Sequence, residues 1–204
     1  MLLLVAMLSL LANSTPTIVT FGDSITEGYG VSKGHTYPDY LQSALNARGF
    51  LCKVVNAGVS GDTTGNALDR LPSILALNSK LVILEFGGND GLRGTPVSST
   101  RRNLEELIKR LQTGGSRVIL VGMTLPLNYG PDFVGQFEKM YADLGVKFKV
   151  TVVNAKDAGV AGAPGLMQPD GIHPTGVGYK KLVEYLLPAV ERELKAIGVS
   201  PAPR

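Results

Sequence analysis

Five residues in four short stretches have the types that acyl transfer requires. They are Ser24 in "FGDSITEG", Gly61 in "VSGDT", Asn89 in "GGND", and Asp170 and His173 in "PDGIHP". Transfer of an acyl group to water needs a nucleophile, a base that contacts it, a group that orients the base and donors for the oxyanion. The sequence therefore raises the hypothesis of a hydrolytic site built on a serine and a histidine.

Ser24 has two interpretations. It follows a short apolar run at the point where a predicted strand gives way to a predicted helix, so its side chain would project at the edge of a sheet. Taken alone, Ser24 is better explained as the N-cap of that helix, because Ser and Asp are preferred capping residues. The stretch by itself leaves both the nucleophile and the cap open.

His173 favours a catalytic interpretation. Asp170 precedes it by three residues, so one turn can place the carboxylate on Nδ1 and leave Nε2 as a base. The alternative is an exposed turn, since Asp-Gly is a turn signal. The chain has only two histidines, and the other, His35, is expected on the surface at the entry to a helix.

Gly61 and Asn89 are candidates for the oxyanion donors. A glycine offers a backbone N–H that no side chain shields, and asparagine offers an amide NH2. Both stretches are also ordinary turn sequences. Ser60 is a rival nucleophile, but no complete G-x-S-x-G occurs in the chain, which argues against an ordinary α/β-hydrolase.

The elements that must position these residues form an alternating pattern. Apolar β-branched runs alternate with helical periodicity, which predicts a parallel sheet in an α/β/α three-layer sandwich. Gly145 is expected to end the fourth helix. Ligands of such sheets gather at the carboxyl ends of the strands, where the candidate residues fall. The predicted strands are 17–22, 52–58, 81–87, 117–123 and 149–155, and the predicted helices are 37–49, 66–78 (interrupted by Pro72), 99–115, 133–145 and 175–198.

Composition limits the class of protein. With 204 residues and 44% hydrophobic content, the chain is expected to form a single domain over residues 15–204. Its formal net charge of +3 is scattered, so no nucleic-acid surface is predicted. Cys52 is the single cysteine, which excludes an intramolecular disulfide, and it is predicted to be buried. Two histidines and one cysteine predict no metal site.

Residues 1–14 form a separate apolar segment. The run "MLLLVAMLSLLA" is too short to cross a bilayer, which takes about 20 residues. It resembles the apolar core of a secretory signal with Ala12 as the candidate cleavage position, although the usual basic stretch is missing. We expect a periplasmic or secreted protein, with a lipid-facing anchor or a docking helix as the alternatives.

Four blocks, in order, resemble the SGNH hydrolases, also called the GDSL family of esterases and lipases. They are "FGDSITEGYG", "NAGVSGDTT", "FGGNDGLRG" and "DGIHPTGVGY", and the resemblance covers roughly residues 17–195. The stretches "SGDTTGNALDRLP" and "LPLNYG" are similar to the bacterial branch of acyl-CoA thioesterase I, protease I and lysophospholipase L1, which also contains arylesterases. The resemblance implies a flavodoxin-like SGNH fold with a central five-stranded parallel sheet.

The resemblance also implies a role for each candidate residue. Ser24 would be the nucleophile, His173 the base and Asp170 the carboxylate that orients it. The backbone N–H groups of Ser24 and Gly61 and the side chain of Asn89 would form the oxyanion hole. The reaction would pass through an acyl-enzyme and need no metal or organic cofactor.

The acyl chain is expected to lie along the loops 91–97 and 124–130, against Leu92, Pro126, Leu127 and Tyr129. We therefore expect a serine hydrolase that cleaves carboxylic esters and thioesters, as an arylesterase, acyl-CoA thioesterase or lysophospholipase does. The expected partner is a small-molecule ester or thioester, with no nucleic acid and no stable membrane insertion after removal of the leader. The sequence indicates neither an oligomeric state nor a chain-length preference.

Two alternatives stay open. The first is an SGNH carbohydrate acetylesterase, against which the low aromatic content of 6% and the absence of Trp argue. The second is a non-catalytic α/β binding module in which Ser24 only caps a helix and "DGIHP" only forms a turn.

Overall fold

A five-stranded parallel sheet forms the middle layer of the computed structural model, which describes residues 15–202. The strand order is β2-β1-β3-β4-β5, so β1 lies between β2 and β3 and the chain changes direction across the sheet there. This arrangement confirms the predicted sheet, and it creates the crevice at the carboxyl ends of β1 and β3 where such folds bind ligands. The strands are β1 (Thr17–Gly22), β2 (Lys53–Gly58), β3 (Leu81–Glu85), β4 (Arg117–Gly122) and β5 (Thr151–Asn154).

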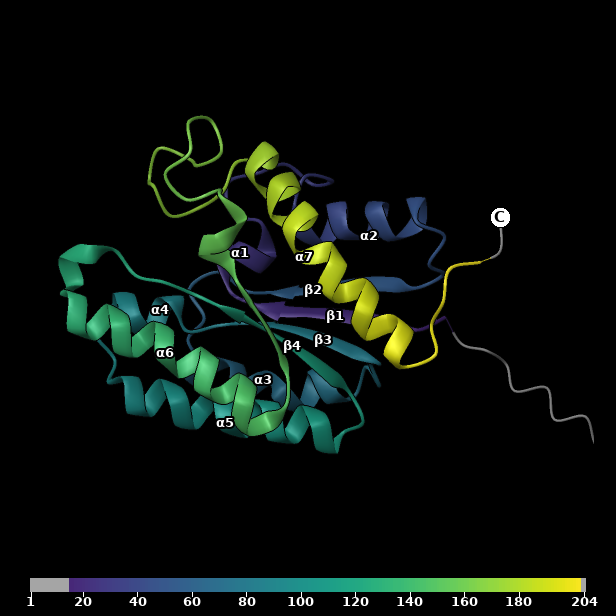
Figure 1. The fold of residues 1–204 in the computed structure, drawn as a ribbon, viewed down its shortest axis with the longest axis horizontal. Coiled ribbons are helices and arrows are strands. Elements are labelled where there is room, and N and C mark those ends of the chain that lie inside the picture. The colour runs from purple at the N-terminus through teal and green to yellow at the C-terminus, as the bar shows by residue number, and fades with distance from the viewer. Residues whose placement is uncertain (1–14, 203–204) are drawn as a thin grey trace, which may run out of the picture.

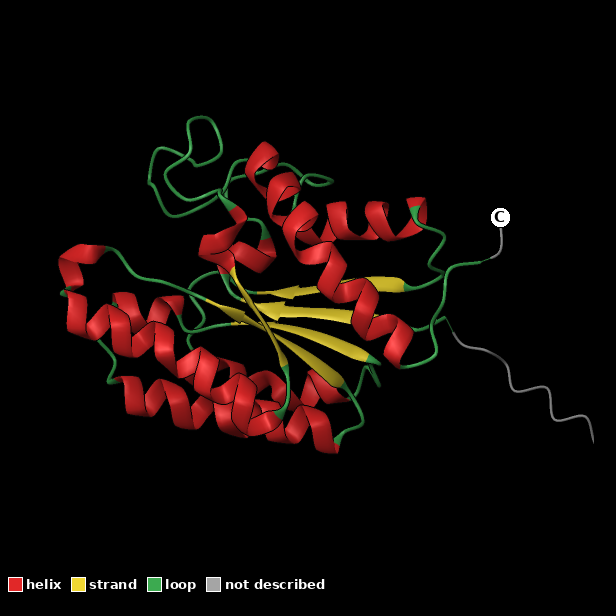
Figure 2. Cartoon of the chain, in the orientation of Figure 1, coloured by secondary structure: helices red, strands yellow, loops and turns green. Residues whose placement is uncertain are grey.

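Helices cover both faces of the sheet, as Figures 1 and 2 show. Helices α2 and α7 pack on one face, and α3, α5 and α6 pack on the other. Successive strand residues alternate between the layers: Ile18 and Ile83 face α2 and α7, whereas Val19 and Leu84 face the other helices. The helices are α1 (Ser24–Glu27), α2 (Tyr37–Ala47), α3 (Thr64–Leu75), α4 (Gly88–Leu92), α5 (Val97–Thr113), α6 (Pro131–Phe148) and α7 (Gly176–Ala196), with 3-10 turns η1 (Leu127–Tyr129) and η2 (Ala155–Ala158).

Capping residues explain where two of these helices begin. Thr36 and Thr63 each accept a hydrogen bond from the backbone N–H three residues later, at Asp39 and Asn66. The side chains of Asp39 and Asn66 accept in return from the backbone N–H of the cap, which completes a capping box. The start of α3 follows directly on the loop that holds Gly61, so this cap fixes one edge of the predicted site.

Gly145 does not end the fourth predicted helix. Helix α6 continues to Phe148, and Lys149 takes the left-handed conformation there with φ 54°. A Cβ on Gly145 would lie 2.5 Å from Val152 Cγ2. The prediction was wrong because this glycine allows α6 to approach β5 closely, and periodicity along one helix cannot reveal such a contact.

Two other helix predictions also need correction. Pro72 lies inside α3 and does not interrupt it. The stretch around Asn89, expected to be a loop, forms the short helix α4. Cys52 is buried, as predicted.

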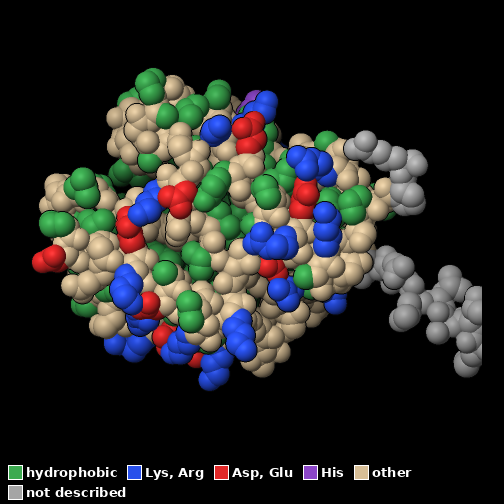
Figure 3. Space-filling model, viewed as in Figure 1, with side chains coloured by type: hydrophobic (Ala, Val, Ile, Leu, Met, Phe, Trp, Pro, Cys, Tyr) green, Lys and Arg blue, Asp and Glu red, His purple; other side chains and the backbone are tan. Residues whose placement is uncertain are grey.

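The surface carries charges of both signs. On the face shown in Figure 3, Lys and Arg side chains are interspersed with Asp and Glu. Ion pairs join charged side chains of the described residues, such as Arg101 with Asp143 and Lys156 with Glu138. Within residues 15–202, no helix is long and apolar enough to cross a membrane. The predicted leader, residues 1–14, lies outside the described residues.

Candidate active site

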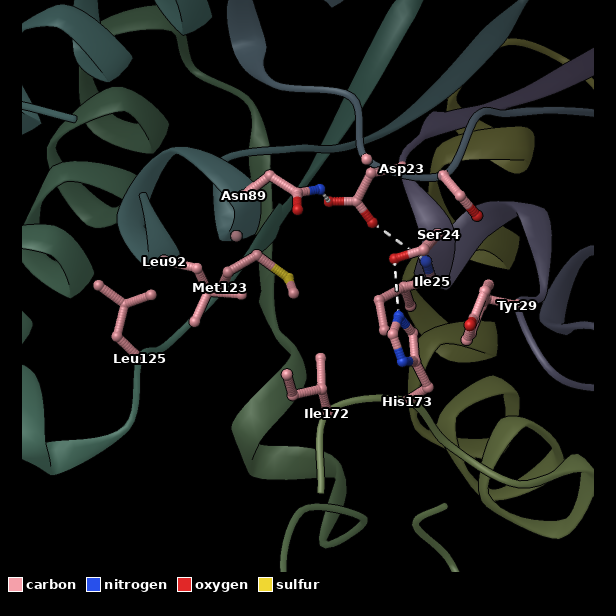
Figure 4. A pocket seen from close by; sticks show the side chains of 13 residues that line it. Asp23, Ser24, Ile25, Tyr29, Asn89, Leu92, Met123, Leu125, Ile172 and His173 are labelled. Carbon is pink, nitrogen blue, oxygen red and sulfur yellow. Dashed lines mark hydrogen bonds between the residues drawn. The ribbon is translucent and has the colours of Figure 1, made fainter. Parts of the chain in front are cut away.

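A cavity of about 280 Å³ opens at the carboxyl ends of the strands. Ser24, Gly61, Asn89 and His173 all line it, so the fold gathers predicted residues that are far apart in the sequence. Leu92, Met123 and Leu125 lie across the cavity from Ser24 and His173 (Figure 4). The lining residues are Asp23, Ser24, Ile25, Tyr29, Ser60, Gly61, Gly88, Asn89, Leu92, Met123, Leu125, Ile172 and His173.

Ser24, His173 and Asp170 form a continuous chain of polar contacts. Ser24 Oγ lies 2.9 Å from His173 Nε2, and His173 Nδ1 lies 2.7 Å from Asp170 Oδ2. Both distances are within hydrogen-bonding reach. The arrangement allows the imidazole to remove the hydroxyl proton while the carboxylate holds the opposite ring nitrogen.

The turn before α7 fixes Asp170. Its Oδ1 accepts hydrogen bonds from the backbone N–H groups of Ile172 and His173, at 2.9 and 3.0 Å. The hydrogen bonds from the His173 backbone and ring lower the pKa of the Asp170 carboxyl to about 2. The ring of Tyr29 lies beside the imidazole, with 4.7 Å between ring centroids. Asp170 is therefore an anion over the whole neutral range, oriented toward Nδ1.

Ser24 is not the cap of α1. Asp23 caps that helix, because its side chain accepts a hydrogen bond from the backbone N–H of Ile25. Ser24 is the first helical residue, and its side chain points at the histidine (Figure 4). The capping signal in "GDS" was real but belongs to the neighbouring aspartate.

The two other predicted oxyanion donors lie on separate loops. Gly61 adopts φ +84°, a conformation that favours glycine, and its carbonyl accepts from Arg93. Asn89 lies on α4, where its side-chain Nδ2 donates to Asp23 Oδ2 at 3.1 Å and to the backbone oxygen of Asp62 at 3.0 Å. Short α4 thus presents the amide toward the end of β1.

The predicted acyl-binding residues separate into two groups. Leu92 lines the cavity, whereas Pro126, Leu127 and Tyr129 do not. The side chains at 127 and 129 belong to η1, and Leu127 is 79% exposed. Tyr129 acts on the cavity only indirectly, because its hydroxyl donates to the backbone oxygen of Leu92.

Met123, Leu125 and Ile172 supply the apolar lining that the sequence reasoning missed. Met123 and Leu125 come directly after β4, and Ile172 lies between the two residues of the predicted Asp–His pair. The position of Met123 and Leu125 after the end of β4 was a usable signal. Which of several apolar residues in one loop faces a cavity depends on backbone conformation, which the sequence pattern does not give.

A buried pair of carboxyl groups lies beneath the serine. Asp23 is 2% exposed and Glu85, at the end of β3, is 1% exposed. Burial raises the pKa of Asp23 to about 6, and burial together with the Asp23 charge raises the pKa of Glu85 well above its usual range. Glu85 Oε2 accepts from the Asp23 backbone N–H and from Thr26 Oγ1. Burial therefore favours the protonated form of both carboxyls relative to an exposed carboxyl group.

Arg70 ties the loops of the site together. Its guanidinium donates to the backbone oxygens of Gly22 and Ala57 and to the carboxylate of Asp62. The same group lies over the ring of Phe21, 4.7 Å from its centroid. No pattern in the sequence indicates this role, because Arg70 occupies an ordinary polar position of helix α3.

Comparison with known proteins gives a consistent result. The sequence model of the GDSL-like lipase/acylhydrolase family matches residues 20–181. Esterase TesA of Pseudomonas aeruginosa is 37% identical over 176 residues, which span 86% of this chain and 88% of that protein. The thioesterase 1/protease 1/lysophospholipase L1 of Escherichia coli is 33% identical over 173 residues, which span 84% of this chain and 82% of that protein. A crystal structure of TesA matches with a TM-score of 0.84 at 37% identity, covering 87% of this chain and 99% of that chain.

Proposed function

The chain belongs to the GDSL-like lipase/acylhydrolase family and is a carboxylic-ester hydrolase, and we propose that Ser24 is its nucleophile. The proposal rests on one observation, the contact chain from Asp170 Oδ2 through both nitrogens of His173 to Ser24 Oγ. In this proposal His173 is the general base and Asp170 holds the imidazole in the tautomer that leaves Nε2 free to accept a proton.

The reaction proceeds in two halves. As Ser24 Oγ attacks the ester carbonyl, its proton passes to His173 Nε2, and the carbonyl oxygen becomes an oxyanion. His173 then gives the proton to the leaving alcohol, and the acyl group stays on Ser24. In the second half His173 takes a proton from water as the water attacks the acyl-enzyme, and it returns this proton to Ser24 Oγ as the bond between Oγ and the acyl group breaks and the acid leaves.

Three donors stabilise the oxyanion in this proposal. They are the backbone N–H groups of Ser24 and Gly61 and the side-chain amide of Asn89, all of which belong to cavity-lining residues. Preorganised donors act on charge that develops only in the transition state, so removal of one costs on the order of 10²–10³ in rate.

We propose that the enzyme accepts thioesters as well as oxygen esters, with short and medium acyl chains. The same serine attack applies to a thioester, and the Escherichia coli relative is named as a thioesterase. Leu92, Met123, Leu125 and Ile172 give the acyl chain an apolar wall opposite Ser24. The cavity volume of about 280 Å³ lies at the small end of ligand pockets, which favours short and medium chains.

Labelling with a fluorophosphonate probe tests the nucleophile. The wild-type protein is expected to label at Ser24, and Ser24→Ala and His173→Ala are expected to lose labelling while keeping the wild-type circular-dichroism spectrum. Equal labelling of Ser24→Ala would overturn the assignment.

A substrate series tests the substrate class. p-Nitrophenyl esters from acetate to palmitate, acyl-CoA thioesters and acetyl-xylan are compared by kcat/KM. We expect activity on the short and medium esters and on the thioesters. A strong preference for acetyl-xylan would instead support the carbohydrate acetylesterase.

We further propose that residues 1–14 direct export of the protein. This proposal rests on the apolar run alone. Mass spectrometry of protein recovered from the periplasm is expected to show a chain that begins just after Ala12, and recovery of the full chain from the cytoplasm would contradict export.

A further inference from the structure

Both hydrogen atoms of the Asn89 amide are donated within the protein. One bond goes to Asp23 Oδ2 at 3.1 Å and the other to the backbone oxygen of Asp62 at 3.0 Å. An NH2 group has two donors. An oxyanion in the cavity can therefore bind Asn89 only if it takes the place of one of these two acceptors.

Asp23 is the more firmly held of the two acceptors. Its Oδ1 accepts from the backbone N–H of Ile25 at 3.0 Å, and its own backbone N–H donates to Glu85 Oε2 at 3.3 Å. The residue is 2% exposed. The oxygen of Asp62, in contrast, is a backbone acceptor directly after the cavity-lining Gly61, so the amide hydrogen it accepts is the one that an oxyanion bound beside Gly61 would take over.

We propose that Asp23 is a positioning residue of the oxyanion hole: it holds one hydrogen of the Asn89 amide and thereby aims the other at the oxyanion, which replaces the oxygen of Asp62. The inference rests on the proposed function, because it assumes that Asn89 donates to the oxyanion. Both carboxylate oxygens of Asp23 are bound by protein donors, so Asp23 acts through Asn89.

The chemistry of position 23 requires a carboxylate. One oxygen serves the Ile25 N–H and the other serves Asn89. Asparagine has the same shape but only one oxygen, so its NH2 would face either the Ile25 N–H or the Asn89 NH2. Asp23→Asn therefore removes the orienting bond without opening a cavity.

A double-mutant cycle separates positioning from a general structural role. Asp23→Asn is expected to lower kcat by about 10- to 100-fold, because the misdirected amide loses much of its effect on the oxyanion. KM for p-nitrophenyl butyrate is expected to change by less than about threefold, since ground-state binding does not use this bond. In an Asn89→Ala background, Asp23→Asn is expected to cost less than about threefold, because the amide it positions is gone.

A matched control uses another capping carboxylate. Asp39→Asn also removes a carboxylate that caps a helix, at α2, but Asp39 does not contact Asn89. Its effect on kcat is expected to be the same in the wild-type and Asn89→Ala backgrounds. If Asp23→Asn fails to fold, Asp23→Ser enters the same cycle, because serine still caps a helix but is too short to hold the amide.

Each outcome bears on a different claim. Effects of Asp23→Asn and Asn89→Ala that multiply in the double variant would overturn the positioning role. A wild-type enzyme that neither hydrolyses p-nitrophenyl butyrate nor labels with the fluorophosphonate would instead overturn the proposed function.

Discussion

Asp170 makes two kinds of hydrogen bond, and this determines what an amide would do in its place. Oδ1 accepts from two backbone N–H groups, at Ile172 and His173, while Oδ2 faces His173 Nδ1. An asparagine there would keep its oxygen on the two N–H groups and turn its NH2 toward Nδ1. The imidazole would then carry its proton on Nε2, where it cannot act as a base.

We predict that Asp170→Asn lowers kcat/KM by about 10³- to 10⁴-fold while the fold is retained. The measurement is the hydrolysis of p-nitrophenyl butyrate, together with a thermal unfolding curve to establish that the protein is folded. A loss below about tenfold would show that Asp170 does not set the tautomer.

At the residue scale, the sequence predicted the groups that lie at strand ends. Residue type and position together made four of these residues recognisable: Ser24, Gly61, Asn89 and His173. Each lies in a loop that follows the carboxyl end of a predicted strand, which is where open α/β sheets bind ligands. Asp23 and Glu85 could not be recognised in this way, because their importance comes from burial against each other, across 62 positions of the chain. Such a contact has no periodicity that a single sequence can show.

At the scale of single elements, two glycines of α6 differ in their surroundings. A Cβ on Gly145 would lie 2.5 Å from Val152 Cγ2 on β5, whereas a Cβ on Gly135 would meet no atom within 4 Å. Neither has a positive φ. Substitution by alanine changes the helix propensity in the same way at both positions. A difference between the two effects on the free energy of unfolding therefore reports the packing of α6 against the sheet.

We predict that Gly145→Ala lowers the free energy of unfolding by about 1–3 kcal/mol, because overpacking pushes α6 away from β5. Gly135→Ala is expected to raise it by about 0.5–1 kcal/mol, because alanine is the better helix former. Urea denaturation of both variants measures the difference. Stabilisation by both substitutions would show that α6 has room at position 145.

The elements themselves were predicted better than their ends. Periodicity found all five strands and the five long helices, but it placed the end of α6 at Gly145 and missed α4. Both errors arise from tertiary contacts. Gly145 allows α6 to pack closely against β5. Helix α4 is held in place by Asp90, whose carboxylate accepts hydrogen bonds from Thr64 at the start of α3.

For the whole molecule, the buried carboxyl pair couples folding to pH. Burial raises the pKa of Glu85 well above its usual range and the pKa of Asp23 to about 6. The unfolded chain loses these protons at lower pH than the folded chain does, so the pair lowers stability as pH rises from about 4 through 6 and above. Tyr37 on α2 and Tyr179 on α7 face the same cluster and stay protonated over this range, because burial and the charge of Glu85 raise their pKa values.

We predict that the free energy of unfolding falls less between pH 5 and pH 8 in Glu85→Gln than in the wild type. Glutamine keeps an oxygen for Asp23 N–H and Thr26, and its NH2 takes the place of Oε1, which has no hydrogen-bond partner among residues 15–202. Urea denaturation at the two pH values provides the comparison, in which the titrating groups away from Asp23 and Glu85 cancel. Equal pH dependence in both proteins would show that Glu85 titrates normally.

The two ends of the described chain lie together, far from the cavity. Pro16 binds the start of β2 through its carbonyl, and the N–H of Ala202 donates to the oxygen of Gly49 just before that strand. Both are at the amino ends of the strands, whereas the site opens at the carboxyl ends (Figure 1). Coupling either end to a surface, a bead or a carrier protein would therefore leave the opening of the active-site cavity facing solvent. This makes the fold suited to oriented immobilisation.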